Sequence, residues 1–257
     1  MRLWIDTDVG TNIDDAVALL AAVSHPAVEL VGVSTVGSDP ERRAAAAVGL
    51  LASAGVDLGA VVVCAGSDEA VTGISSAGAE ALLAIGPLTN VAAMTAAGVR
   101  PPELTIMGGA LHPVEHRGEL RAVEHNFASD PDAAATVLAV PGAVLVPLDA
   151  TVAARLDDRL LAKLVATAPI LEPMVQAWVA EWDGVVLHDP AALLIAAGDG
   201  TELARFERRR LRVEPDGRVI EGGQGASGTV HDVVTSLFGV AVVASVLALL
   251  ADLKLTG

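Results

Sequence analysis

Short apolar runs alternate with longer Ala-rich stretches through the first half of the chain. The apolar runs predict strands at 3–5, 28–36, 60–64, 80–85, 104–107 and 144–147. The stretches between them predict helices at 16–23, 42–54, 90–97 and 130–139. This alternation is typical of an α/β fold, in which helices flank a mostly parallel central sheet.

The second half of the chain is more helical. Its pattern predicts helices at 155–168 and 171–182, a further helix opening at His188, and a two-stranded excursion at 206–219. Residues 233–251 carry no charge and approach the length of a membrane span. Because polar residues and glycine interrupt this stretch, we expect a buried C-terminal helix and no contact with a membrane. With no repeat, linker or clear boundary, residues 1–257 are expected to form one domain.

Polar or glycine-rich residues follow most of the predicted strands. The segments are DTDVG, STVGSD, CAGSD, IGPLTN and IMGGA. The carboxyl ends of parallel strands share one edge of the sheet, and ligands of such folds bind there. The sequence therefore predicts a binding site at this rim.

The opening segment carries four carboxylates around one predicted turn, those of Asp6, Asp8, Asp14 and Asp15. Carboxylates this close repel one another in a partly dry site unless a cation offsets their charge, and hard oxygen ligands suit Ca²⁺ or Mg²⁺. A solvated turn with an acidic helix N-terminus is the alternative, since the helix dipole favours acidic residues there.

Composition narrows the class of protein. The net charge of −16 argues against nucleic-acid binding, which requires basic residues to meet phosphates. A single cysteine, Cys64, excludes a disulfide within the chain and a cysteine-based zinc cluster, and its apolar surroundings predict a buried thiol. The chain opens without the basic and apolar pattern of a signal peptide, so we expect a cytoplasmic protein.

Six segments occur in one order: DTDVGTNIDDA, GPLTN, IMGGA, VEHNFASDPDAA, VPLDAT and LHDPAA. Together they resemble the inosine-uridine preferring nucleoside hydrolases, from the first strand to about Ala197. The resemblance implies a Rossmann-like nucleoside hydrolase fold with its active site at the carboxyl ends of the strands. It also implies Ca²⁺-dependent hydrolysis of the N-glycosidic bond of a purine or pyrimidine ribonucleoside, which yields ribose and free base.

The resemblance also implies roles for individual residues. Asp8, Asp15 and Asp189 would give carboxylate oxygens to Ca²⁺, and Thr89 its backbone carbonyl. Asp8 would take the proton from the water that attacks the sugar, and His188 would help to protonate the leaving base, although it could instead simply cap the helix. The expected substrate contacts are Asp14, Asp39, Met107, Glu124 and Asn126.

Some segments depart from the family pattern. Asp39 replaces an asparagine, and the loop between Gly73 and Glu80 is shortened. His125 stands where the family usually has phenylalanine, and His125 could touch the ligand or face away from it. A catalytically weakened relative that binds a ribose-containing ligand is therefore the alternative function.

The sequence also bears on one competing function and on the assembly of the protein. The sequence Asp6-x-Asp8 also imitates the nucleophile motif of haloacid-dehalogenase-type phosphatases, but the only lysines, Lys163 and Lys254, are poorly placed for that chemistry. By resemblance and from the apolar tail we expect a homodimer or homotetramer.

Overall fold

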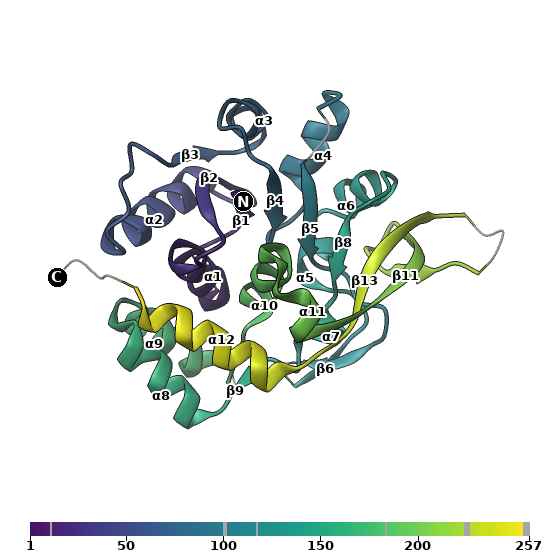
Figure 1. Ribbon diagram of the computed structural model, residues 1–257. Helices are drawn as coiled ribbons and strands as arrows, with labels where there is room; N and C mark the ends of the chain where they lie inside the picture. The colour runs from purple at the N-terminus through teal and green to yellow at the C-terminus, as the bar shows by residue number, and fades with distance from the viewer. Residues whose placement is uncertain (11, 100–101, 117, 183, 224–226, 254–257) are drawn as a thin grey trace.

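A twisted nine-stranded sheet forms the centre of the protein (Figure 1), seen in a computed structural model that describes residues 1–10, 12–99, 102–116, 118–182, 184–223 and 227–253. The strand order is β12-β11-β13-β8-β5-β4-β1-β2-β3. All pairings from β13 to β3 are parallel, whereas β11 pairs antiparallel with both β12 and β13. The predicted α/β class with a mostly parallel sheet is confirmed.

The strands of the central sheet, in chain order, are β1 (Arg2–Thr7), β2 (Glu29–Thr35), β3 (Val62–Ala65), β4 (Ala81–Ala84), β5 (Glu103–Met107), β8 (Val144–Val146), β11 (Ala204–Val213), β12 (Val219–Glu221) and β13 (Thr229–Leu237). Two small antiparallel pairs lie outside it, β6 (Val114–His116) with β7 (Glu119–Arg121) and β9 (Arg155–Leu156) with β10 (Val185–Val186).

The helices are α1 (Ile13–Ser24), α2 (Pro40–Ser53), α3 (Ser67–Ser76), α4 (Thr89–Ala96), α5 (His125–Ser129), α6 (Pro131–Leu138), α7 (Leu148–Thr151), α8 (Asp158–Thr167), α9 (Glu172–Glu181), α10 (His188–Leu194), α11 (Gly200–Leu203) and α12 (Gly239–Ala251). In Figure 1, α1, α10 and α12 lie on one side of the sheet, and α3, α4 and α6 lie on the other.

Strand β1 supplies buried side chains to both faces of the sheet. Leu3 and Ile5 join the apolar cluster that contains α1, α10 and α12, whereas Trp4 joins the cluster beneath α3, α4 and α6. Successive residues of a strand point to opposite faces, which explains this division. All three side chains are at most 1% exposed, so β1 is a fully buried strand, as its apolar run predicted.

Several elements differ from the sequence-based expectations. The helix expected over 155–168 begins only at Asp158, because Arg155 and Leu156 pair with β10 and the Asp157 side chain caps the helix by accepting from Leu160 N. The apolar run 233–251 is not one helix: its first five residues end β13, which pairs with β8 and β11, and α12 starts at Gly239. Helix α3 was not predicted.

Within the described residues, no single helix is long and apolar enough to cross a membrane; only α8 with the segment 169–181, bent by 116° at their junction, passes the same test of length and composition as a pair.

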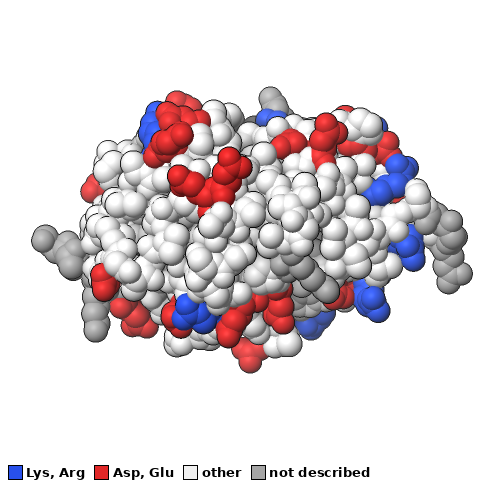
Figure 2. Space-filling model, turned by 90° about the horizontal axis from the view of Figure 1, so that it is seen from above, with Lys and Arg blue, Asp and Glu red and all other residues white. Residues whose placement is uncertain are grey.

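Charge is unevenly distributed over the surface. Figure 2 shows acidic side chains in separate groups, while much of the basic surface lies at the end of the molecule where Figure 1 places β11. Two arginines of the segment 204–221, which forms β11 and β12, pair with acidic residues of the same segment. Arg209 contacts Glu221, and Arg218 contacts Asp216, each at 2.6 Å. These ion pairs offset part of the positive charge of the segment.

Candidate active site

A pocket lies at the carboxyl ends of four neighbouring strands. Asp8 follows β1, Ile85 follows β4, Met107 ends β5 and Leu148 follows β8 closely. These strands are consecutive in the sheet, so their ends form a continuous rim. The residues lining the pocket are Asp8, Asn12, Asp14, Ile85, Met107, Arg121, Val123, Glu124, His125, Asn126, Leu148, His188 and Asp189. The predicted location of the site at this edge of the sheet agrees with the pocket.

The turn after β1 brings Asp8 to the rim through close backbone packing. Gly10 adopts φ of 125°, a conformation that residues with a Cβ rarely adopt. Across the turn, a Cβ on Gly86 would lie 2.7 Å from Val36 Cγ1 and 3.0 Å from the backbone nitrogen of Asp8. The loops after β1, β2 and β4 therefore pack tightly here only because position 86 has no side chain.

Three buried carboxylates converge beside the pocket. Asp14 and Asp15 come from the first turn of α1, and Asp189 comes from the first turn of α10. One oxygen of each lies within 4.8 Å of the others. Asp15 Oδ1 accepts from Thr7 Oγ1 at 2.5 Å, while Asp15 Oδ2 is buried and has no hydrogen-bond partner among the described residues.

Burial and mutual repulsion make these groups hard to ionise. Burial, followed by the charges of Asp8 and Asp14, raises the pKa of Asp15 well above its usual range. Burial and the charges of Asp14, Asp15 and Asp8 do the same to the pKa of Asp189. Burial also raises the pKa of Asp8, with the positive charge of Arg43 acting in the opposite direction. A cation among these oxygens would relieve the repulsion.

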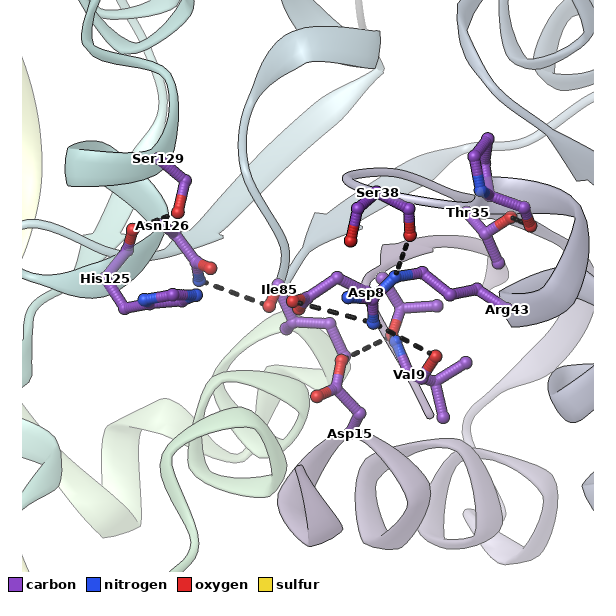
Figure 3. A network of polar contacts seen from close by, with 12 residues as sticks. Asp8, Val9, Asp15, Thr35, Ser38, Arg43, Ile85, His125, Asn126 and Ser129 are labelled. Carbon is purple, nitrogen blue, oxygen red and sulfur yellow. Dashed lines mark hydrogen bonds and ion pairs between the residues drawn. The ribbon is translucent and has the colours of Figure 1, made fainter. Parts of the chain in front are cut away.

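Glu124 organises the opposite wall of the pocket. It precedes α5, and its carboxylate accepts from the backbone nitrogens of Asn126 at 2.8 Å, Phe127 at 3.2 Å and Gly109 at 3.0 Å. Burial nevertheless raises its pKa to about 7, against the effect of these bonds. Asn126 donates through Nδ2 to the carbonyl of Ile85 at 3.2 Å (Figure 3) and to the carbonyl of Met107 at 3.2 Å, and so joins the carboxyl ends of β4 and β5.

His188 lies in the pocket wall at the start of α10. Its Nδ1 is 2.7 Å from Thr151 Oγ1, and this hydroxyl also donates to the carbonyl of Leu148 at 3.1 Å. The Thr151 hydroxyl therefore holds the orientation of the His188 ring. His125 and Arg121 line the pocket as well, which resolves the open question of whether His125 faces the ligand site.

The structure brings most of the predicted site residues together. Asp8, Asp14, Met107, Glu124, Asn126, His188 and Asp189 line the pocket, and Asp15 adjoins it through the carboxylate cluster. Asp6 does not line the pocket: it accepts from Ser34 Oγ at 2.5 Å and from Asn90 Nδ2 at 2.7 Å on the other face of the sheet. Asp6 therefore lacks the accessibility that a phosphatase nucleophile requires.

Two predicted residues lie elsewhere. Asp39 is exposed and caps α2 by accepting from Arg42 N at 3.2 Å. Thr89 is exposed in the first turn of α4, where backbone carbonyls are used by the helix itself, and its side chain donates to Asp130 at 2.5 Å. Ile85, whose carbonyl accepts from the pocket residue Asn126, is better placed than Thr89 to offer a backbone oxygen.

Arg43, which the sequence did not single out, reaches the site from α2. Its Nη1 lies 3.8 Å from Asp8 Oδ2, and Figure 3 shows its guanidinium between Asp8, Val9 and Ser38. The position was not predicted because Arg42–Arg43 reads as the start of an ordinary exposed helix. Only the packing of α2 against the β1 turn reveals the contact.

Comparison with known proteins shows to which family the chain belongs. The family model described as inosine-uridine preferring nucleoside hydrolase matches residues 68–237. The chain belongs to this family. Its members are metal-dependent hydrolases that act on N-glycosyl compounds, and their substrates are nucleosides, so the chain is a hydrolase of this kind. The matched residues include Glu124, Asn126 and Asp189, whereas Asp8 and Asp15 lie before them.

Solved structures of nucleoside hydrolases share the fold. A plant nucleoside hydrolase superposes with a TM-score of 0.81 at 19% identity, covering 97% of this chain and 98% of its own. A purine-preferring ribonucleoside hydrolase from Gardnerella vaginalis gives 0.79 at 20% identity, covering 98% and 99%. An inosine-uridine preferring nucleoside hydrolase from Bacillus anthracis gives 0.76 at 18%, covering 98% and 99%. An uncharacterized protein of Schizosaccharomyces pombe is 29% identical over 253 residues, covering 76% of this chain and 79% of its own.

Proposed function

We propose that this nucleoside hydrolase cleaves the N-glycosidic bond of a purine or pyrimidine ribonucleoside with the help of Ca²⁺. One observation carries the proposal. Carboxylates from α1 and α10, which are distant in the sequence, converge within 4.8 Å of one another beside a pocket at the sheet rim. Ionised carboxylates this close repel one another. A bound cation would offset their charge and could hold the hydroxyl groups of a sugar.

The donor set fits a hard divalent cation. Asp15 and Asp189 would supply carboxylate oxygens, with Asp8 at the pocket side of the group. The buried Asp15 Oδ2 without a partner among the described residues is the kind of atom that an ion would satisfy. We assign the backbone oxygen to Ile85 in place of Thr89. A site built mainly from carboxylate and carbonyl oxygens of the protein suits Ca²⁺, because Mg²⁺ usually keeps several of its waters.

Asp8 is the proposed general base. Bound Ca²⁺ would lower the pKa of the attacking water, so that a carboxylate is a sufficient base. Asp8 lines the pocket beside the carboxylate cluster and can receive the proton there. Asp14, Glu124 and Asn126 also line the pocket and would bind the ribose hydroxyls. The negative charge of the ionised Asp14 and Glu124 carboxylates favours the oxocarbenium-like transition state of glycosidic cleavage.

His188 is the proposed acid for the leaving base. The Thr151 hydroxyl lies 2.7 Å from its Nδ1 and orients the ring at the pocket wall. A nucleobase leaves poorly unless it is protonated, so an imidazole that carries a proton beside the base would assist its departure.

Two substrates separate these roles. Wild-type protein with Ca²⁺ should release free base from at least one common ribonucleoside and p-nitrophenolate from p-nitrophenyl riboside. Asp8→Asn should lower turnover of both substrates by about 100-fold or more. His188→Ala should impair nucleoside hydrolysis but largely spare p-nitrophenyl riboside, whose leaving group needs no proton. Near wild-type turnover in Asp8→Asn would refute the assignment of the base.

A catalytically weakened, ribose-binding relative is the second candidate. The position of Asp39 favours it, because this residue caps α2 and lies outside the pocket, which leaves one fewer sugar contact than the sequence predicted. Calorimetry with ribose and Ca²⁺ decides between the two. Binding without turnover of any ribonucleoside or of p-nitrophenyl riboside would support the weakened relative.

Assembly and location remain part of the proposal. We propose a homodimer or homotetramer that acts in the cytoplasm. Helix α12 supports association, because Val240 in its first turn is 88% exposed and the preceding Phe238 is 42% exposed. Sedimentation at micromolar concentration measures the assembly directly, and a monomer at all concentrations would contradict it.

A further inference from the structure

Arg43 connects three segments around the proposed base. Its Nη1 donates to the carbonyl of Val9 at 3.2 Å and lies 3.8 Å from Asp8 Oδ2, while its Nε donates to the carbonyl of Ser38 at 3.1 Å. The guanidinium therefore ties the turn after β1 to the turn after β2, as Figure 3 shows. Only 14% of its side chain is exposed, and the Asp8 side chain is 9% exposed.

The surroundings of this contact favour a specific orientation. Around Gly10 and Gly37, a Cβ would lie 3.9 Å from Arg43 Cγ and 3.8 Å from Arg43 Nε, so both turns pass close to the arginine side chain. A planar guanidinium directs its N–H groups at fixed angles, and a contact in several directions fixes its position. The carboxylate that it contacts is thereby fixed as well.

Asp8 adjoins both the guanidinium and the carboxylate cluster. One oxygen each of Asp14, Asp15 and Asp189 lies within 4.8 Å of the others, and the charge of Asp8 contributes to raising the pKa of Asp15 and of Asp189. Asp8 Oδ2 lies 3.8 Å from Arg43 Nη1. The orientation of the Asp8 carboxylate beside the cluster therefore depends on Arg43.

We propose that Arg43 is a positioning residue for Asp8: it holds the carboxylate in the orientation for accepting the proton from water. This inference rests on the proposed function. The positive charge of Arg43 lies close to the cation site, so it also weakens cation binding. The Arg43 side chain therefore has two effects that variants can separate: its contacts orient Asp8, and its charge weakens cation binding.

Two substitutions of Arg43 separate geometry from charge. Arg43→Met removes both, whereas Arg43→Lys retains the charge but cannot make the same forked set of contacts. We expect both variants to lower kcat on p-nitrophenyl riboside by about tenfold or more, with KM changed much less, because misplacing a reacting group affects the chemical step. By calorimetry, Arg43→Met should bind Ca²⁺ more tightly than wild type, and Arg43→Lys should bind it with wild-type affinity.

Arg42→Met is the matched control. Arg42 is the preceding residue of α2, its side chain is exposed, and its replacement removes the same charge. This control should retain wild-type kcat and change Ca²⁺ affinity less than Arg43→Met does. Thermal unfolding of all variants, each with a chelator, shows whether the fold is retained.

The outcomes are decisive in both directions. Wild-type kcat in Arg43→Met and Arg43→Lys would overturn the positioning role, and equal Ca²⁺ affinity in Arg43→Met and Arg42→Met would overturn the charge effect. A loss of kcat that only parallels a loss of thermal stability would also count against the inference. If wild-type protein hydrolyses no riboside at all, the proposed function fails, whereas the difference in Ca²⁺ affinity still tests the electrostatic part.

Discussion

Replacing Asp15 by asparagine should make the cation-free protein more stable and abolish the stabilisation by Ca²⁺. Ordinarily, substitution of a fully buried polar side chain destabilises a protein. Asp15 differs, because two further carboxylate oxygens lie within 4.8 Å of it and its own Oδ2 has no hydrogen-bond partner among the described residues. Asparagine keeps Oδ1 as the acceptor for the Thr7 hydroxyl. Its amide nitrogen replaces the charged Oδ2 and can donate to the neighbouring carboxylates, which the charged oxygen repelled.

The magnitude follows from the geometry. At 4.8 Å and an effective dielectric constant of about 20, two carboxylates repel by about 3.5 kcal/mol, which gives about 7 kcal/mol for two neighbours. Proton uptake limits this cost. Holding an aspartic acid protonated at pH 7 against an unfolded-state pKa of about 4 costs about 4 kcal/mol. We therefore expect Asp15→Asn to gain about 1–4 kcal/mol without cation.

Bound cation should reduce the advantage of the variant, and should reverse the order of stability where that advantage is below about 2.7 kcal/mol. At a Ca²⁺ concentration of about 100 times its dissociation constant, wild type gains about 2.7 kcal/mol, while the variant gains little because a ligand is lost. For a protein of this size, 1 kcal/mol shifts the melting temperature by about 2–4 °C. Chelation should therefore lower the melting temperature of wild type by about 5–10 °C and leave that of Asp15→Asn nearly unchanged.

Thermal unfolding at pH 7 measures these differences, first with a chelator and then with millimolar Ca²⁺. Asp232→Asn is the control, because this aspartate is exposed on β13 and its replacement removes the same charge. The reasoning is refuted if chelation leaves the wild-type melting temperature unchanged and Asp15→Asn is the less stable protein in chelator. The three carboxylates would then be a structural cluster and not a cation site.

Two further predictions concern the core and the pH dependence. Gly32→Ala should destabilise the protein by about 1–3 kcal/mol in urea unfolding, because its Cβ would lie 2.2 Å from the Trp4 ring, whereas Gly49→Ala, with no atom within 4 Å, should be neutral or slightly stabilising. Glu124 has a folded-state pKa of about 7, raised by burial from 4.5, so its contribution to stability is present below pH 4.5 and is lost as the pH rises to 7. In chelator, Glu124→Gln should therefore reduce the loss of stability between pH 5 and 7.5 by up to about 3 kcal/mol, and an unchanged pH dependence would contradict the shift.

Elements whose formation depends mainly on neighbouring residues were predicted well. The apolar run of β1, the turn at Gly10 and the Ala-rich α1 were all placed correctly, since periodicity and backbone conformation depend on neighbouring residues. The stretch 233–251 was misread because strand pairing is not local. Its first five residues form a strand only because β8 and β11 lie on either side of them.

The same distinction between local and non-local interactions explains which residues of the site could be predicted. Residues of the opening motif and of the HDP segment could be named from the sequence, because their spacing resembles a family pattern. The roles of Arg121 and Arg43 could not, since nothing in their own segments marks them, and the segment IGPLTN was singled out without showing that the Ile85 carbonyl reaches the site. Their relevance arises from contacts across 41 residues for Ile85 and Asn126, and 34 for Arg43 and Val9.

By itself, the sequence determined most of the strands and helices of the first half of the chain and which acidic side chains end up at a strand or helix terminus. The tertiary structure alone decided that Asp6 turns to the opposite face of the sheet, that Asp39 caps a helix, and that Arg43 contacts Asp8. The physical reason is the range of the interactions. Local conformation follows from a residue and its neighbours, whereas a charge or ligand contact depends on how the sheet orders its strands and on which helices pack against their ends.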